Sequence, residues 1–184
     1  MPIFANIGIG GGTGGGASNF LSVDASAFDA WSANGAAYKI DSVEASDGSV
    51  VDFAAFTFDE ATQQGIQLMI RNTNNFFTTA NFKARLKLRR ETAGDTNYDV
   101  HMGVLGRFIT ADPDVSQAVV IPADTVRLSV EGDLYDSDWI TVPCEGSITD
   151  TCILVIDVLR IADHEYDTLD GLAQIVGVEF EFNQ

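Results

Sequence analysis

Residues 82–109 of the chain read FKARLKLRRETAGDTNYDVHMGVLGRFI, and this stretch decides the fold class. Its first part alternates between apolar and basic side chains: Phe82, Ala84, Leu86 and Leu88 alternate with Lys83, Arg85, Lys87 and Arg89. After turn-forming residues at 91–97, the alternation resumes from Tyr98 to Val104. A period of two places successive side chains on opposite faces of a β-strand. The stretch therefore predicts two strands joined by a turn.

Similar short runs lie on both sides of this stretch, separated by clusters of Gly, Asp, Asn and Pro. Asp47-Gly48 between two apolar runs predicts a hairpin, because a type I′ turn needs positive φ at both central residues. Including the two strands above, we expect about ten strands; the others cover residues 36–43, 50–55, 66–70, 118–121, 125–130, 139–142, 152–161 and 175–182. Short strands without βα alternation predict an all-β fold, an antiparallel, jelly-roll-like β-sandwich.

The first 34 residues have a different composition. Residues 8–16 read GIGGGTGGG, which lacks packing side chains and predicts a flexible, extended arm. The expected arm contacts are Ile3, Phe4, Ile7, Ile9, Gly10 and Gly12. Residues 19–34 contain Leu21, Phe28 and Trp31 and favour a short helix that ends at Gly35. We therefore divide the chain into an N-terminal arm and joint, residues 1–34, and a β-sandwich domain, residues 35–184.

The charge balance excludes one class of partner. The chain has 27 acidic and 10 basic residues, a net charge of −17. Nucleic-acid affinity comes mainly from neutralising phosphates with Lys and Arg, so we expect no nucleic-acid partner. No signal-peptide pattern and no membrane-spanning apolar run are present, so we expect synthesis in the cytoplasm and no membrane partner.

Two cysteines, Cys144 and Cys152, flank a turn-like stretch. They could form a disulfide only if two strands bring them into range. Without a secretion signal we favour two reduced thiols. Neither histidine has zinc-ligand spacing to them, so we expect no metal and no cofactor.

The basic strand is the sharpest local feature. Lys83, Arg85, Lys87, Arg89 and Arg90 are five of the ten basic residues. One interpretation is a docking stripe for an acidic neighbour, which can be another copy or a capsid shell. The other interpretation is internal pairing with acids on an adjacent strand, for example Glu179 and Glu181.

Residues 152–161 read CILVIDVLRI, which is apolar on both faces apart from Asp157 and Arg160. Such a strand lies centrally in a sandwich or faces another subunit on its outer side. Ile153, Val155 and Leu159 are the candidate subunit-interface residues.

No catalytic constellation emerges. Gly10-x-Gly12-x-x-Gly15 matches a dinucleotide fingerprint but lacks the βαβ context. His101 shares a strand face with Asp99, yet no nucleophile elbow accompanies the pair. Paired acids fit solvated loops, although a calcium site built from several loops stays open. We therefore predict that the protein is not an enzyme. Aromatic residues could line a sugar platform or the core: Trp31, Trp139, Tyr98 and Tyr135.

The glycine-rich arm, the acidic β body and the strand pair at 82–109 together resemble jelly-roll cement or decoration proteins of tailed bacteriophage capsids. The resemblance implies a virion structural protein: a homotrimer on the capsid exterior that binds the major capsid protein and stabilises the head through its body and arm. It carries no functional residue over by position.

Two alternatives from other classes remain. A carbohydrate-binding or adhesion module, for example of a virion fibre, predicts exposed aromatic residues on a sheet face or loop rim. A glycoside-active jelly roll predicts two carboxylates about 5–9.5 Å apart across a cleft.

Overall fold

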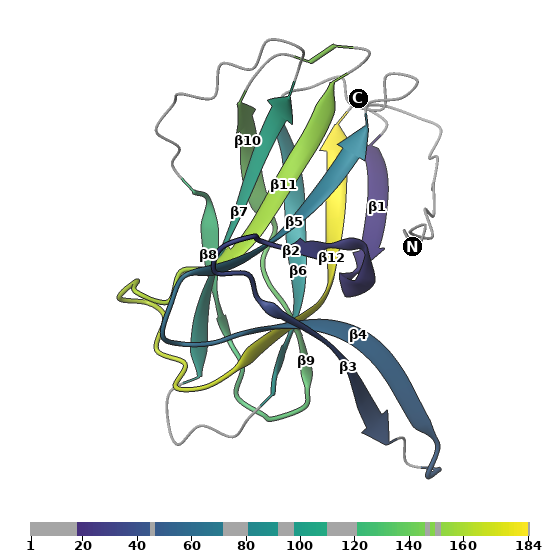
Figure 1. Cartoon of the computed structure of the whole chain (residues 1–184), viewed down its shortest axis with the longest axis vertical. Helices are drawn as coiled ribbons and strands as arrows, with labels where there is room; N and C mark the ends of the chain where they lie inside the picture. Colours follow the sequence, from purple (N-terminus) through teal and green to yellow (C-terminus); the bar gives the residue numbers. More distant parts are fainter. Residues whose placement is uncertain are drawn as a thin grey trace.

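The computed structural model describes residues 18–44, 47–71, 81–91, 98–109, 121–145, 148–149 and 152–183. In these residues the protein is built from twelve strands and one short 3₁₀ turn, Ala25–Ala27 (Figure 1). The strands are β1 (Ser18–Asp24), β2 (Asp29–Ala30), β3 (Ala37–Glu44), β4 (Val50–Phe58), β5 (Gln64–Arg71), β6 (Asn81–Arg90), β7 (Asp99–Ile109), β8 (Ala123–Arg127), β9 (Leu134–Asp136), β10 (Ile140–Glu145), β11 (Ile153–Arg160) and β12 (Ala173–Asn183). The described part of the chain contains no helix that is long and apolar enough to cross a membrane.

The strands form two layers. In one, β12 pairs with β6 along one edge and with β1 and β4 along the other, and β3 continues the layer beyond β4. In the other, β11 lies between β5 and β7, with β2 and β8 outside them. Figure 1 shows β5, β11 and β7 in front of β6 and β12. The predicted all-β, jelly-roll-like β-sandwich is confirmed.

Strand β10 joins the two layers. Its first half, Ile140 to Pro143, runs antiparallel to β6, and its last two residues pair in parallel with β7. Strands that change sheet in this way make the corners of β-sandwiches. The two packed layers therefore share one strand.

The core lies between the layers and follows from the alternation in the sequence. Leu86 and Leu88 on β6 and Phe180 on β12 are fully buried, as are Met102 on β7 and Leu154 on β11. Burial of each such side chain contributes roughly 1.5–3 kcal/mol.

Of the short helix expected within residues 19–34, only the 3₁₀ turn Ala25–Ala27 after Asp24 is present, and Ser18–Asp24 forms a strand instead. Strand β1 pairs with β12 along its whole length, from Ser18↔Asn183 to Asp24↔Gly177. Leu21 and Val23 point into the core. Apolar side chains recur at every second residue here, at Leu21 and Val23, which suits a strand. The free edge of β12 satisfies the backbone N–H and C=O groups of such a strand.

The hairpin expected around Asp47-Gly48 is confirmed, but its turn is not type I′, because of these two residues Gly48 alone has a positive φ. Strands β3 and β4 pair from Ala37↔Thr57 to Glu44↔Val50. Gly48 has a φ of +82°, a backbone conformation that residues other than glycine rarely adopt. The outer part of this hairpin extends away from the rest of the strands (Figure 1).

One strand was not expected from the sequence, and one expected strand lies almost wholly outside the described residues. β9 was not predicted, and it pairs with β6 in a short ladder, Leu88↔Tyr135 at its centre. Of the strand expected at 118–121, only Ile121 is among the described residues, and it precedes β8.

Candidate functional site

The outer face of β6 carries four basic side chains, those of Lys83, Arg85, Lys87 and Arg89, and each of them has an acidic partner. Lys83 Nζ lies 3.1 Å from Glu181 Oε2, and Lys87 Nζ lies 3.1 Å from Glu179 Oε1. Both acids are on the neighbouring strand β12, in register with β6. Internal pairing, one of the two interpretations of the stripe, is therefore confirmed for these residues. Half-exposed pairs of this kind contribute roughly 0.2–1 kcal/mol each.

The two last arginines of the stripe behave differently from each other. Arg89 Nη1 donates to Asp41 Oδ2 at 2.9 Å, and its guanidinium lies over the Phe53 ring. Arg90 points to the opposite face of the strand and is buried, with its guanidinium 4.7 Å from the centre of the Tyr98 ring. Arg90 therefore does not belong to a surface stripe, because strand side chains change face at each residue.

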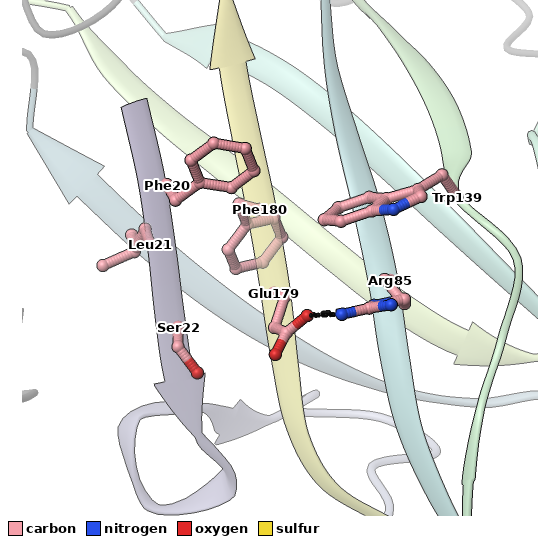
Figure 2. Close-up of a pocket in the computed structure, with 7 residues that line it drawn as sticks. All are labelled: Phe20, Leu21, Ser22, Arg85, Trp139, Glu179 and Phe180. Atoms are coloured by element: carbon pink, nitrogen blue, oxygen red, sulfur yellow. Dashed lines mark hydrogen bonds and ion pairs between the residues drawn. The ribbon is translucent and has the colours of Figure 1, made fainter. Parts of the chain in front are cut away.

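An aromatic groove lies on the same outer face. Phe20 on β1 and Trp139, just before β10, are 48% and 37% exposed. Beside the two rings, Glu179 on β12 and Arg85 on β6 form an ion pair, and Arg85 lies nearest Trp139 (Figure 2). The depression has a volume of about 240 Å³ and is lined by Phe20, Leu21, Ser22, Arg85, Trp139, Glu179 and Phe180. We call it the Phe20–Trp139 groove.

The polar floor of this groove is held rigidly. Arg85 Nε and Nη2 donate to Glu179 Oε2 at 2.9 and 2.5 Å, and the guanidinium lies 5.0 Å from the centre of the Trp139 ring. The hydrogen bond from Arg85 lowers the pKa of Glu179 below its usual value, although partial burial opposes this. Glu179 is therefore ionised at neutral pH and accepts hydrogen bonds. It is a poor proton donor for catalysis.

A second, larger depression adjoins the groove at Ser22. Its volume is about 570 Å³, and it lies between the β3–β4 hairpin and strands β1, β9 and β12. Val51, Phe53 and Leu134 give it an apolar wall, and Lys87 and Asp133 add charges.

The other predicted contact residues are distributed as follows. The arm residues Ile3, Phe4, Ile7, Ile9, Gly10 and Gly12 lie outside the described residues. Val155 and Leu159 on β11 are 4% and 1% exposed within the chain itself, and Ile153 is half-buried. A side chain at Gly103 would meet both Ile121 and Leu159, so these two residues pack over β7. The central position of β11 thus accounts for its two apolar faces, and the subunit interface stays a prediction.

His101 does not pair with Asp99. Its Nδ1 lies 2.8 Å from Thr125 Oγ1, and its ring stacks on that of His164 at 4.1 Å. Asp99 lies 3.8 Å from Arg127 instead. Burial, assisted by the charge of His164, lowers the pKa of His101. No group of three or more His, Cys, Asp or Glu side chains suited to a metal ion occurs in the described part of the chain.

Cys144 and Cys152 do not form a disulfide with each other, and both are free thiols, as predicted. Burial raises the pKa of the Cys144 thiol to about 12.

Of the four aromatic residues that could have formed a sugar platform, the structure places only Trp139 in the groove. Trp31 Nε1 donates to the buried Asp157, and Tyr135 OH bonds to the backbone of Val130. Phe20 was missed, since residues 19–34 were interpreted as a joint between the arm and the β-sandwich and not as part of a sheet. Its alternation with Leu21 and Ser22 was the available signal.

No family model matches the chain, and no curated protein matches its sequence. Among solved structures, it is similar to the mosquito-larvicidal Cry4Aa toxin from Bacillus thuringiensis, at 8% identity and a TM-score of 0.41. That alignment covers 90% of this chain and only 24% of the toxin, so the chain spans about a quarter of that protein.

Two carbohydrate-binding modules are also similar in structure. One is TmCBM61 in complex with β-1,4-galactotriose, at 8% identity and a TM-score of 0.36, covering 80% of this chain and 88% of the module. The other is a promiscuous module of the β-sandwich superfamily, at 11% identity and a TM-score of 0.40, covering 92% and 73%. These are likenesses of fold alone. None of the three is described as a capsid protein, so the resemblance to cement proteins stays a prediction.

Proposed function

We propose that this β-sandwich protein binds carbohydrate in the Phe20–Trp139 groove without acting on it chemically. The observation that carries the proposal is the pair of exposed aromatic rings beside the Arg85–Glu179 ion pair (Figure 2). Aromatic rings offer a flat apolar surface, and a few fixed polar groups beside them give orientation. Sugar rings present both an apolar face and hydroxyl groups, which suits this combination.

The charges of the site favour a neutral sugar. Arg85 is already bonded to Glu179, so it has no free positive charge for a carboxylate or sulfate group. The net charge of −17 also repels acidic polysaccharides. Ionised Glu179 can accept a hydrogen bond from a sugar hydroxyl, while the remaining Arg85 N–H groups can donate to a ring or hydroxyl oxygen.

The experiment is a screen of neutral and acidic glycans on an array, followed by calorimetry with any glycan that binds. Trp139→Ala and Phe20→Ala should each weaken binding by about tenfold or more, which corresponds to roughly 1.4 kcal/mol. Tyr166→Ala is the matched control, since Tyr166 is a 56% exposed aromatic residue outside the groove. Equal affinities of the three variants, or binding of acidic glycans alone, would contradict the proposal.

A role in virion assembly, as a capsid cement protein, is the second candidate. The observation that favours an assembly role is the concentration of exposed apolar side chains on the β3–β4 hairpin, where Ile40, Val50 and Val51 are about 60% exposed. The test is to delete residues 1–16 and measure occupancy on empty capsids. Decoration at full occupancy by the truncated protein would refute a clamping role for the arm.

A further inference from the structure

Strand β3 is an open edge with an apolar surface. Among the described residues it pairs with β4 alone, which leaves its second row of backbone N–H and C=O groups without strand partners. Among the residues that the structure describes, five of the twelve exposed large apolar side chains lie on this hairpin, namely Tyr38, Ile40, Val43, Val50 and Val51. Long exposed apolar edges are templates for pairing with another chain.

We infer that β3 is a self-association edge, at which two copies of this chain pair antiparallel about a two-fold axis. Such a dimer would extend the β6–β12–β4–β3 layer continuously across both copies. The inference is independent of the carbohydrate groove, which is lined by β1, β6, β12 and Trp139.

The sequence of β3 selects one register. In a two-fold antiparallel pair of identical strands, one residue lies opposite its own copy. If this residue is Ile40, two apolar side chains meet on the axis, and Lys39 lies opposite the partner's Asp41 on both sides of it. Opposite charges facing each other across strands stabilise the pair by roughly 0.2–1 kcal/mol each.

The adjacent registers are unfavourable. Placing Lys39 on the axis would bring two ammonium groups together, and placing Asp41 there would bring two carboxylates together. Like charges directly opposite one another destabilise a strand pair. Of the registers that place Lys39, Ile40 or Asp41 on the axis, the one centred on Ile40 pairs opposite charges, and this self-complementarity is why we assign a second copy as the occupant and not another protein.

Both charged side chains remain accessible for this pairing. Lys39 and Asp41 side chains are 35% and 23% exposed. Within the chain Lys39 pairs with Glu91, and Asp41 accepts from Arg89 at 2.9 Å and from Gln174 at 3.0 Å. The partner's charges would join an existing network, whose geometry already fixes the two side chains on one face of β3.

The test is the mass of the full chain by light scattering across a dilution series, at physiological ionic strength to screen the repulsion between acidic copies. We expect a dimer that Ile40→Lys converts to monomer. Met69→Lys is the matched control, because Met69 and Ile40 are both 60% exposed and Met69 lies on β5. Hydrogen exchange should show that those amides of residues 37–43 that point away from β4 lose protection on dilution.

A charge-swap experiment tests the register. Lys39→Asp and Asp41→Lys should each be monomeric alone, and their mixture should form a heterodimer, since each altered charge then meets its opposite. Circular dichroism establishes that each variant is folded. A monomeric wild-type chain, or an oligomer that Ile40→Lys leaves intact, would overturn the inference. A trimer unaffected by Ile40→Lys would likewise overturn it and favour another surface.

Discussion

Arg160 and Asp167 form an ion pair inside the protein, with Nη2 2.7 Å from Oδ1 and side chains 0% and 2% exposed. Arg160 also donates to the carbonyl oxygens of Leu169 and Gly171, and Asp167 accepts from the backbone N–H of His101. The pair therefore ties the loop after β11 to β7.

Asp167→Ala should destabilise the protein by about 3–5 kcal/mol, because it leaves a buried guanidinium without its counter-charge. Urea denaturation would measure the loss. Asp163→Ala, an exposed acid in the same loop, should change stability by less than about 0.5 kcal/mol. Similar effects of the two substitutions would show that the pair is not an energetic anchor.

The stacked pair of His101 and His164 predicts a pH dependence near neutrality. The folded state lowers the pKa of His101 through burial and the charge of His164. The unfolded chain therefore binds the proton more tightly, so stability should fall as the pH drops through the usual value of 6.5. Thermal denaturation between about pH 5 and 8 would measure this change in stability. Carboxylates ordinarily titrate below this pH range.

His101→Gln is the matched variant for that measurement. It removes the titration while keeping a side chain that can hydrogen-bond to Thr125. Its stability should vary less with pH than that of the wild type over the same range. If both proteins show the same slope, another group is responsible.

Most strands of the fold were predictable because apolar and polar side chains alternate within each of them. Residues 82–90 show this most clearly, and the acids Glu179 and Glu181 were already candidates for pairing with them. Strand β1 was not predictable with the same ease. Its alternation covers only a few residues, and it becomes a strand because β12, more than 150 residues later in the chain, offers an edge.

The candidate site was predictable only in part for the same reason. Trp139 stood out as an aromatic residue, whereas Phe20 and Trp139 come together only through the pairing of β1, β12 and β6. The residues next to Phe20 and Trp139 in the sequence do not reveal which strands will pair or in what register. Including Arg90 in the stripe was wrong. Strand periodicity already predicts that Arg90 points to the face opposite to Arg89.

Gly65 on β5 should be intolerant of a side chain because the Trp31 ring lies against it. A Cβ atom at position 65 would come within 2.4 Å of Trp31 Cε2. Gly65→Ala should therefore displace the indole, weaken the 2.9 Å hydrogen bond from Trp31 to Asp157 and cost about 1–3 kcal/mol.

Fluorescence can report this displacement directly. The chain has two tryptophans, so a Trp139→Phe background leaves Trp31 as the single indole. In that background Gly65→Ala should change the emission of Trp31 in the folded state. An unchanged spectrum together with unchanged stability would contradict the tight packing of this ring.

The thiols provide a last prediction, which concerns opening of the sandwich where its layers meet. Cys144 lies on β10, where that strand pairs with β7, and burial raises the pKa of its thiol to about 12. The thiolate is the reactive form, so in the folded protein Cys144 should react very slowly with a thiol reagent at pH 8. Cys152 is also buried.

Labelling followed by mass spectrometry, without and with denaturant, would measure both rates. Gly106→Ala should accelerate labelling of Cys144, since a Cβ at position 106 would lie 2.7 Å from Cys144 Sγ and 2.7 Å from Phe82 Cε1. Cys152, which lies just before β11 and is not among the nearest atoms that this Cβ would meet, should stay protected. Equal acceleration at both thiols would mean that the substitution loosens the whole sandwich, and rapid labelling of wild-type Cys144 would contradict its burial.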